Sequence, residues 1–312
     1  MNARDVFIEP RKGYVLHRLL RTGALKVQAF LNGFDPAAKQ NAGIFTDPSL
    51  YPIFVVGAPR SGSTLLYQLL IRHMGLAYIS NFMSLVPIRM IQIAKYGRRF
   101  HGTKNIQESR WGYLSGIFAP SEAGGVQRKW FEGKPDGEAR KMIRGTVVSL
   151  SDIFSAATVV KNLANSLRLE NILTLFPEGQ FIFIRRNLIF NAQSILISRR
   201  QLLGSEQQWW STKPRGYREV MKLSPARQVI WQVNEIERSI TSFLAAKNPH
   251  FLEITYEQLC DNPDMILKTI AEKFNQKLFA TDLKGKILLR NKIRLLPAEF
   301  ETLKKSAADT VE

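Results

Sequence analysis

The residues with the clearest chemical potential lie at 57–64, where a hydrophobic run gives way to the sequence GAPRSGST. Gly57, Gly62 and Thr64 match the phosphate-binding pattern G-x-x-x-x-G-K-[ST]. Ser63, however, stands at the lysine position, and the cation comes earlier, at Arg60. In kinases and nucleotide hydrolases that lysine neutralises a multiply charged phosphoryl group beside magnesium. A loop without it suits a less charged group, and a sulfuryl group fits that description.

The donors of this loop predict how it holds an anion. Two glycines let backbone N–H groups turn inward, and a helix starting near Gly62 adds the positive end of its dipole, so a 5′-phosphate can bind there. The Arg60 guanidinium supplies donors for the bridging oxygen of a leaving group. Hydroxyl groups add further donors. The residues expected to contact the nucleotide here are Arg60, Ser61, Gly62, Ser63 and Thr64.

A second segment, 180–194, reads as a buried strand ending in Arg185 and Arg186, followed by a helix that brings Ser194 round two turns later. Together with the loop at 57–64 it resembles the sulfotransferases that use 3′-phosphoadenosine 5′-phosphosulfate (PAPS). In that family a P-loop binds the 5′-phosphosulfate, and a strand-end arginine with a serine eight residues on binds the 3′-phosphate. Arg186 and Ser194 have that spacing, although Asn187 departs from the usual R-D-P continuation. Arg185 could be a solvated charge.

The resemblance extends to two more strand ends. The segment 158–168 is similar to the family's strand that ends in a lysine, which makes Lys161 a candidate to stabilise the transferring sulfonate; a surface lysine is the alternative. The segment 251–263 is similar to a family strand and helix in which Tyr256 would stack near the adenine, or could pack in the core. Cations at 283–286 and 290–292 fall where the family closes over the 3′-phosphate.

Transfer to an alcohol or amine also needs a general base. Glu122 is the candidate, because it lies in a turn marked by glycine and proline and the family's bacterial members carry a similar P-x-E-x-G segment. Glu108 and His101 are alternatives, and a solvated loop carboxylate is the plain reading of Glu122. The catalytic set expected is therefore Glu122, Lys161 and Arg60.

Strand candidates at 52–57, 158–161, 180–185 and 251–255 alternate with helical stretches at 62–74, 165–176, 187–203 and 225–246. This order predicts an α/β fold, a P-loop-type three-layer sandwich with a mostly parallel central sheet flanked by helices. Ligands of such folds bind at the carboxyl ends of the strands, where the candidate residues fall. We expect one sulfotransferase domain at 51–303, an N-terminal basic helical arm at 1–50 and a frayed tail at 304–312.

The stretch 80–157 is too long for a single crossover and is expected to form a helical lid over the acceptor region. A single helix over 83–96 is predicted, with Trp111, Trp130 and Phe131 near the mouth or, alternatively, in ordinary packing. An aromatic-rich loop at 207–217 could line an acceptor or sugar site or cap the fold.

The formal net charge is +18, from 44 basic and 26 acidic residues, more than one nucleotide requires. The excess favours an anionic partner, such as an acidic glycan, a glycolipid or an anionic membrane surface. The segment 11–31 mixes apolar and basic residues at helical spacing, so it could lie on a membrane or dock on the domain. No apolar run reaches the ~20 residues that span a bilayer. With one cysteine, Cys260, and scattered histidines, we expect a cytoplasmic protein without a metal.

These features predict a sulfotransferase that moves a sulfonate from PAPS to a hydroxyl, or less readily an amine, of a carbohydrate, glycolipid or small molecule. Two other classes are open. A P-loop kinase or NTPase would share the loop but would need a lysine at 63 and a magnesium-binding aspartate. A basic nucleic-acid-binding protein would explain the charge but not the spacing of Arg186 and Ser194.

Overall fold

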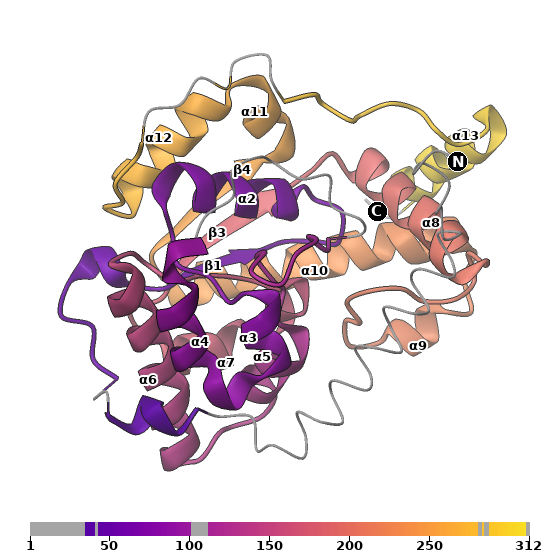
Figure 1. The fold of residues 1–312 in the computed structure, drawn as a ribbon. Coiled ribbons are helices and arrows are strands. Elements are labelled where there is room, and N and C mark those ends of the chain that lie inside the picture. The colour runs from indigo at the N-terminus through magenta and orange to yellow at the C-terminus, as the bar shows by residue number, and fades with distance from the viewer. Residues whose placement is uncertain (1–34, 41–42, 101–111, 280–282, 284–286, 310–312) are drawn as a thin grey trace, which may run out of the picture.

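The computed structural model describes residues 35–40, 43–100, 112–279, 283 and 287–309 (Figure 1). Four parallel strands form its central sheet in the order β2-β1-β3-β4. Their bounds are β1 Ile53–Val56, β2 Val159–Lys161, β3 Gln180–Arg185 and β4 Phe251–Thr255. The register pairs Phe54 with Val160 on one side and with Phe181 on the other. All four predicted strands are confirmed to within a residue or two.

Helices cover both faces of the sheet, as Figure 1 shows. Phe54, Val56, Phe181 and Phe183 point into one hydrophobic cluster, whereas the alternating residues of the same strands point into another. The first face is covered by α3 Asn81–Leu85, α4 Met90–Gly97, α5 Gly124–Phe131, α6 Gly137–Phe154, α7 Leu169–Leu175, α8 Leu188–Leu203, α10 Pro225–Lys247 and α13 Pro297–Ala308. The second is covered by α2 Ser63–Met74, α11 Tyr256–Asp261 and α12 Pro263–Lys273. The predicted three-layer α/β fold is confirmed.

The described residues of the region 80–157 form several helices joined by loops, and most of these helices are a layer of the core. Trp130 and Phe131 are 1% and 0% exposed and pack beneath the sheet, so their expected place near the mouth was wrong and ordinary packing is confirmed. The single helix predicted over 83–96 was also wrong. Pro87 interrupts it, because a proline cannot continue the hydrogen-bond ladder: α3 ends at Leu85, and α4 begins at Met90 after the 3-10 turn η3 Pro87–Arg89.

Two other expectations need correction. The helix expected at 165–176 is divided into the 3-10 helix η5 Leu163–Leu167 and α7, with Arg168 between them outside the helical region. Residues 304–308 are the last turns of α13 and are not frayed, because Leu303 and Ala307 are buried against the core. The remaining short elements are the 3-10 helices η1 Pro36–Gln40, η2 Pro48–Leu50 and η4 Arg98–Phe100, and the helix α9 Tyr217–Val220.

The amphipathic segment at 11–31 lies outside the described residues. Within the described chain, no helix is long and apolar enough to cross a bilayer. Asp35 is the first residue of the N-terminal arm that the structure describes. It directly precedes η1, which packs against α6. The Asp35 side chain is 1% exposed; one carboxylate oxygen accepts from the Ile91 N–H at 2.7 Å and the other from the Ala37 N–H at 3.0 Å. This carboxylate therefore joins the arm to the start of α4.

We predict that Asp35→Ala destabilises the protein by about 2 kcal/mol, because it leaves two N–H donors without their acceptor, one of them buried. Asp47→Ala is the matched control: Asp47 accepts from the Ser49 N–H at 2.8 Å, but it is exposed and caps only the three-residue η2. The Asp47→Ala variant should lose less than about 1 kcal/mol of unfolding free energy. Urea unfolding measures the free energy of unfolding of both variants. An equal decrease in the two would contradict the structural role that we assign to the Asp35 carboxylate.

Candidate active site

The candidate site lies at the carboxyl ends of β1 and β3. From β1 the chain crosses to β2 on one side, and from β3 it crosses to β4 on the other, so these neighbouring strands form the topological switch point of the sheet. Residues 57–62 follow β1 and lead into α2, whereas Arg186 follows β3 and leads into α8. The sheet thereby brings together two segments about 130 residues apart, as the Arg60–Ser194 separation of 134 shows.

Close packing explains both glycines of the loop. A Cβ at Gly57 would lie 2.4 Å from the Ile184 carbonyl oxygen, so the loop can approach β3 only with glycine there. Gly62 has a φ of +93°, and a Cβ at this position would lie 2.4 Å from the Tyr256 ring. The loop is thus fitted against β3 on one side and against an aromatic ring on the other.

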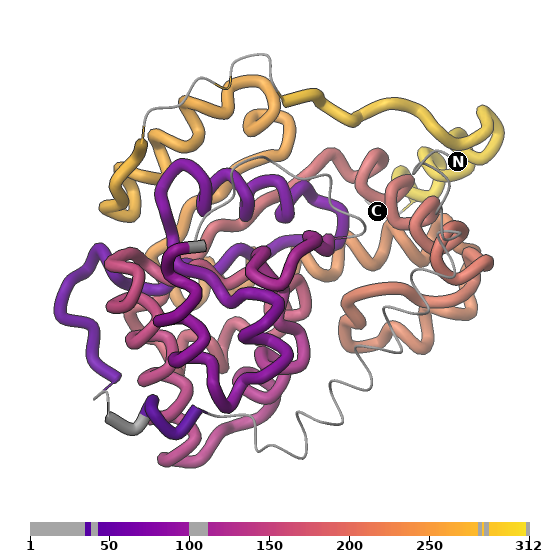
Figure 2. Tube along the Cα trace, viewed as in Figure 1, coloured from indigo at the N-terminus to yellow at the C-terminus, as the bar shows by residue number. Residues whose placement is uncertain are grey.

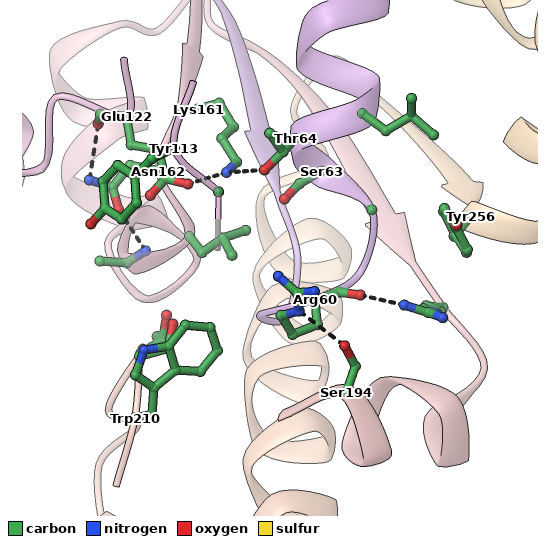
Figure 3. A pocket seen from close by; sticks show the side chains of 18 of the residues that line it. Arg60, Ser63, Thr64, Tyr113, Glu122, Lys161, Asn162, Ser194, Trp210 and Tyr256 are labelled. Carbon is green, nitrogen blue, oxygen red and sulfur yellow. Dashed lines mark hydrogen bonds and ion pairs between the residues drawn. The ribbon is translucent and has the colours of Figure 1, made fainter. Parts of the chain in front are cut away.

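Arg60, Arg186 and Ser194 form one corner of the site. The Arg60 Nε donates to Ser194 Oγ at 3.0 Å, and Arg186 Nη1 donates to the Arg60 carbonyl at 3.1 Å (Figure 3). Burial lowers the pKa of Arg60 to about 10, with further lowering by the positive charges of Arg186, Arg294 and Arg290. Arg60 still carries its charge at neutral pH, and a bound anion would relieve the repulsion among these cations.

Tyr256 supports this corner from the other side. Its ring lies against Gly62, the Arg186 guanidinium stands over it at 4.6 Å from the centroid, and its hydroxyl accepts from the Arg290 N–H at 3.3 Å. Tyr256 is 5% exposed and still lines the cavity described below. Core packing is therefore confirmed for Tyr256, whereas a place beside an adenine stays a prediction.

A C-terminal segment, 287–296, runs beside the corner on its way to α13 (Figure 2). The Arg186 guanidinium donates to Asn291 Oδ1 at 2.7 and 2.9 Å and to the Arg290 carbonyl at 2.9 Å. Gln193, which precedes Ser194, donates to the Lys292 carbonyl and accepts from the Arg294 N–H. The segment is thus hydrogen-bonded to both predicted 3′-phosphate elements, the end of β3 and α8.

The second part of the site is a lysine–glutamate pair. Lys161, at the end of β2, is 1% exposed; its Nζ donates to Thr64 Oγ1 at 2.9 Å and forms an ion pair with Glu122. Asn162 donates to the Glu122 backbone carbonyl at 3.3 Å. The Glu122 side chain is 21% exposed and faces the cavity. The alternative of a surface lysine is wrong for Lys161, because the residue is buried.

One cavity of about 990 Å³ joins the two parts. Arg60, Ser194 and Tyr256 lie on one side of it, Lys161 and Thr64 near its middle, and Glu122, Tyr113 and Trp210 on the other side (Figure 3). Among the lining residues that the structure describes, the acids are Glu122 and Glu132. The cations are Arg60, Lys161, Arg168, Arg186, Lys213, Arg290 and Arg294. Such a cavity is large enough for a nucleotide and suited to an anionic one.

A model of the sulfotransferase family matches residues 52–279, which include every residue of both parts up to Tyr256. The chain belongs to the sulfotransferase family. The fold agrees: sulfotransferase STF9 of Mycobacterium avium aligns at 13% identity and a TM-score of 0.53, over 85% of this chain and 77% of that one. Sulfotransferase STF1 of Mycobacterium tuberculosis aligns at 15% identity and a TM-score of 0.49, over 96% and 84%. No curated protein matches.

Most of the predicted site residues of this sulfotransferase line one cavity. They are Arg60, Gly62, Ser63, Thr64, Glu122, Lys161, Arg186, Ser194 and Tyr256. Ser61 does not: its N–H donates to the Ala58 carbonyl, and its fully buried hydroxyl points beneath the loop toward Gly57. Arg185 is also separate, since it pairs with Glu237 at 2.9 Å and Glu253 at 3.1 Å. The alternative bases Glu108 and His101, together with Trp111, lie outside the described residues.

Sequence reasoning missed several lining residues of this sulfotransferase. Asn162 directly follows Lys161 at the end of a strand, which is a signal that could have found it. Tyr113, Glu132, Arg168 and Arg294 also line the cavity, and they come from a loop, the end of α5, the residue before α7 and the C-terminal segment. Nothing in their spacing distinguishes them from surface residues.

We predict that Gly62→Ala destabilises the sulfotransferase by about 2–4 kcal/mol, because it adds both backbone strain and a clash that displaces the Tyr256 ring. Gly133→Ala is a matched control. Gly133 has a similar φ of +90°, but a Cβ there would meet nothing within 4 Å, so only the strain of about 1–2 kcal/mol should appear. Urea unfolding measures the free energy of unfolding of both variants. An equal decrease in the two would show that the contact with Tyr256 does not restrict the side chain at position 62.

Proposed function

We propose that this sulfotransferase uses PAPS as donor and transfers its sulfonate to a hydroxyl group of an acceptor. The observation that carries the proposal is the arrangement along a single cavity, with the Arg60–Arg186–Ser194 corner at one side and the buried Lys161–Glu122 pair beyond Thr64. A donor with phosphates at both its 3′ and 5′ positions would need two anion sites, and the presence of Arg186 with Ser194 beside the loop at 57–64 supports that assignment.

In this proposal the donor's 3′-phosphate binds at Arg186 and Ser194, its adenine lies near Tyr256, and its 5′-phosphosulfate lies on the loop with Ser63 and Thr64. The terminal nitrogens of Arg60 make no hydrogen bond within the described part of the chain, so they are available to phosphate oxygens. Ser61 is given no contact with the donor in this proposal, because its hydroxyl is buried beneath the loop and its N–H donates to the Ala58 carbonyl. Burial is the main cause of the lowered pKa of Arg60, and the anion would also relieve the repulsion by neighbouring arginines that lowers it further.

The proposed chemistry is a direct in-line displacement. The acceptor oxygen attacks sulfur, the new S–O bond forms as the bond from sulfur to the bridging oxygen breaks, and adenosine 3′,5′-bisphosphate leaves with that electron pair. Glu122 takes the acceptor's proton, and Lys161 stabilises the charge on the moving sulfonate. Positioning and electrostatics supply most of the rate, because no covalent enzyme intermediate is needed.

The wider assignments also belong to this proposal. The acceptor is a carbohydrate, a glycolipid or a small molecule with a hydroxyl group, and the reaction requires no metal. The charge of +18 favours peripheral contact with an anionic membrane from the cytoplasmic side. Nucleic acid is not expected as a partner, because a cavity site does not present its cations along a groove.

Calorimetric titration with adenosine 3′,5′-bisphosphate tests the donor. We predict metal-independent binding that weakens at least about 100-fold in Arg186→Ala and about tenfold in Ser194→Ala, since each removes charge-assisted hydrogen bonds. Arg185→Ala, which alters the neighbouring arginine that faces Glu237, should bind within about threefold of the wild type. Binding of ATP with magnesium in preference to the bisphosphate would instead favour a kinase.

Steady-state kinetics test the base. Glu122→Gln should lower kcat by about 10²–10⁴-fold, because the base is lost. The same change leaves the buried Lys161 ammonium without its carboxylate partner, so the anionic bisphosphate should bind at least as tightly as it does to the wild type. Glu132→Gln is the control, since Glu132 is the other acid described in the lining and its side chain is 62% exposed. A large fall in kcat in the Glu132 variant but not in the Glu122 variant would assign the base to Glu132.

A further inference from the structure

The C-terminal segment 287–296 exposes several large apolar side chains. Leu288, Leu289, Ile293 and Leu296 are between 44% and 79% exposed, and all four lie in this one short run. A single exposed leucine is ordinary, but an apolar cluster at the surface marks a place of interaction. Figure 1 shows the segment as an extended stretch at the edge of the molecule, before α13. Its exposed side chains therefore need an explanation that the core does not give.

The fold holds this segment in place from its inner side. Leu295 is buried in the core, and the N–H groups of Arg294 and Leu295 donate to Gln193 Oε1 at 2.8 and 3.3 Å. The Asn291 amide donates to Glu257 at 2.6 Å and accepts from Arg186. Because both Asn291 and Leu295 are fixed against the protein, the side chains between them are held away from the core. The exposure is thus imposed by the fold.

The segment has two sets of side chains with different surroundings. Those that line the cavity are Ile287, Leu288, Arg290 and Arg294. Those that are exposed and lie outside the cavity lining are Leu289, Lys292, Ile293 and Leu296, which we call the outer set. The outer set combines three apolar side chains with one cation, and the proposed donor site makes no use of it.

The sequence around the outer set is strongly basic. Residues 283–294 include five cations and no acid: Lys284, Lys286, Arg290, Lys292 and Arg294. Among the residues that the structure describes, neither Lys292 nor Arg294 forms an ion pair. The acids that accept hydrogen bonds from the segment are Glu257 and Glu299, and Glu299 is already paired with Arg200 at 2.6 Å. Cations therefore outnumber acids here, so the charge of this surface is complementary to an anionic partner.

Charge also separates the possible occupants of this surface. The N-terminal segment 11–31 carries five cations and no acid, so its own charge opposes docking here. In a two-fold dimer through this surface the segment would meet its own copy, cations against cations. A nucleic acid would pair with the cations but would leave the apolar side chains unused. An anionic phospholipid surface suits both, since its headgroups attract cations and its acyl boundary accepts apolar side chains.

We propose that the outer set is the surface through which this sulfotransferase binds an anionic phospholipid membrane. Leu289, Ile293 and Leu296 enter the headgroup region, and Lys292 lies against lipid phosphates. The inference rests on the proposed function, in that it identifies the surface behind the membrane contact assigned there, but it does not depend on the donor. Because cavity-lining and outer residues share one segment, the arginine side of the cavity would lie next to the membrane.

Sedimentation of the full chain with lipid vesicles tests this surface. Wild-type protein should bind phosphatidylcholine vesicles that contain about 30% phosphatidylglycerol at least about tenfold more tightly than pure phosphatidylcholine. The double variant Ile293→Asn with Leu296→Asn should weaken that binding by at least about tenfold, because two apolar side chains no longer enter the membrane. Lys292→Gln should weaken it about fivefold. Ile117→Asn is the matched control: Ile117 is 65% exposed on a different loop, and its replacement should change nothing.

Calorimetric titration of the double variant with adenosine 3′,5′-bisphosphate accompanies this test. An unchanged affinity is expected, since neither residue lines the cavity, and it would show that the fold is intact. Unchanged vesicle binding by the double variant, or equal binding of the wild type to both kinds of vesicle, would overturn the membrane surface. Tighter binding of polyuridylate than of anionic vesicles would also overturn it, in favour of nucleic acid. Vesicle binding as expected in a protein that fails to bind the bisphosphate would uphold the surface and reject the PAPS donor.

Discussion

The contact between Arg186 and the Arg60 backbone is the constraint on which the site depends. Two guanidinium groups meet at the switch point of the sheet, where their charges repel and burial lowers the pKa of both. The structure compensates with neutral acceptors: the Arg60 carbonyl, the Asn291 amide oxygen and the Arg290 carbonyl all accept from Arg186. Among the residues that the structure describes, no carboxylate forms an ion pair with either cation, which leaves their charge available to a ligand.

On the other side of the cavity, by contrast, the buried cation has a carboxylate partner. Lys161 is buried and is compensated directly by Glu122, so its charge is balanced when no ligand is bound. The two sides therefore differ in electrostatic character along one cavity. An anion is attracted to the arginine side, whereas the lysine–glutamate pair has no net charge of its own with which to attract one.

Much of this organisation could be predicted from the sequence, because it depends on local signals. The strand-turn-helix pattern placed Arg60 and Thr64, and the eight-residue spacing placed Arg186 with Ser194. The orientation of single side chains could not be predicted. Ser61 turns beneath its loop and Arg185 turns toward Glu237, and both outcomes depend on tertiary neighbours. From the sequence alone, Trp130 could lie either near the mouth of the cavity or in the core. It is buried because α5 packs against the sheet.

The hydrogen bonds between α8 and the C-terminal segment have a consequence for folding. Arg186 and Asn291 are 105 residues apart, and Gln193 and Lys292 are 99 apart, so the arginine side of the cavity joins segments that are distant in the chain. Contacts of such separation form slowly, because a large loop must close before they contribute stability. On the ribosome, a nascent chain could complete β1, β2 and β3 and still lack the segment that braces Arg186. The arginine side of the cavity is therefore assembled last, after the sheet that supports it.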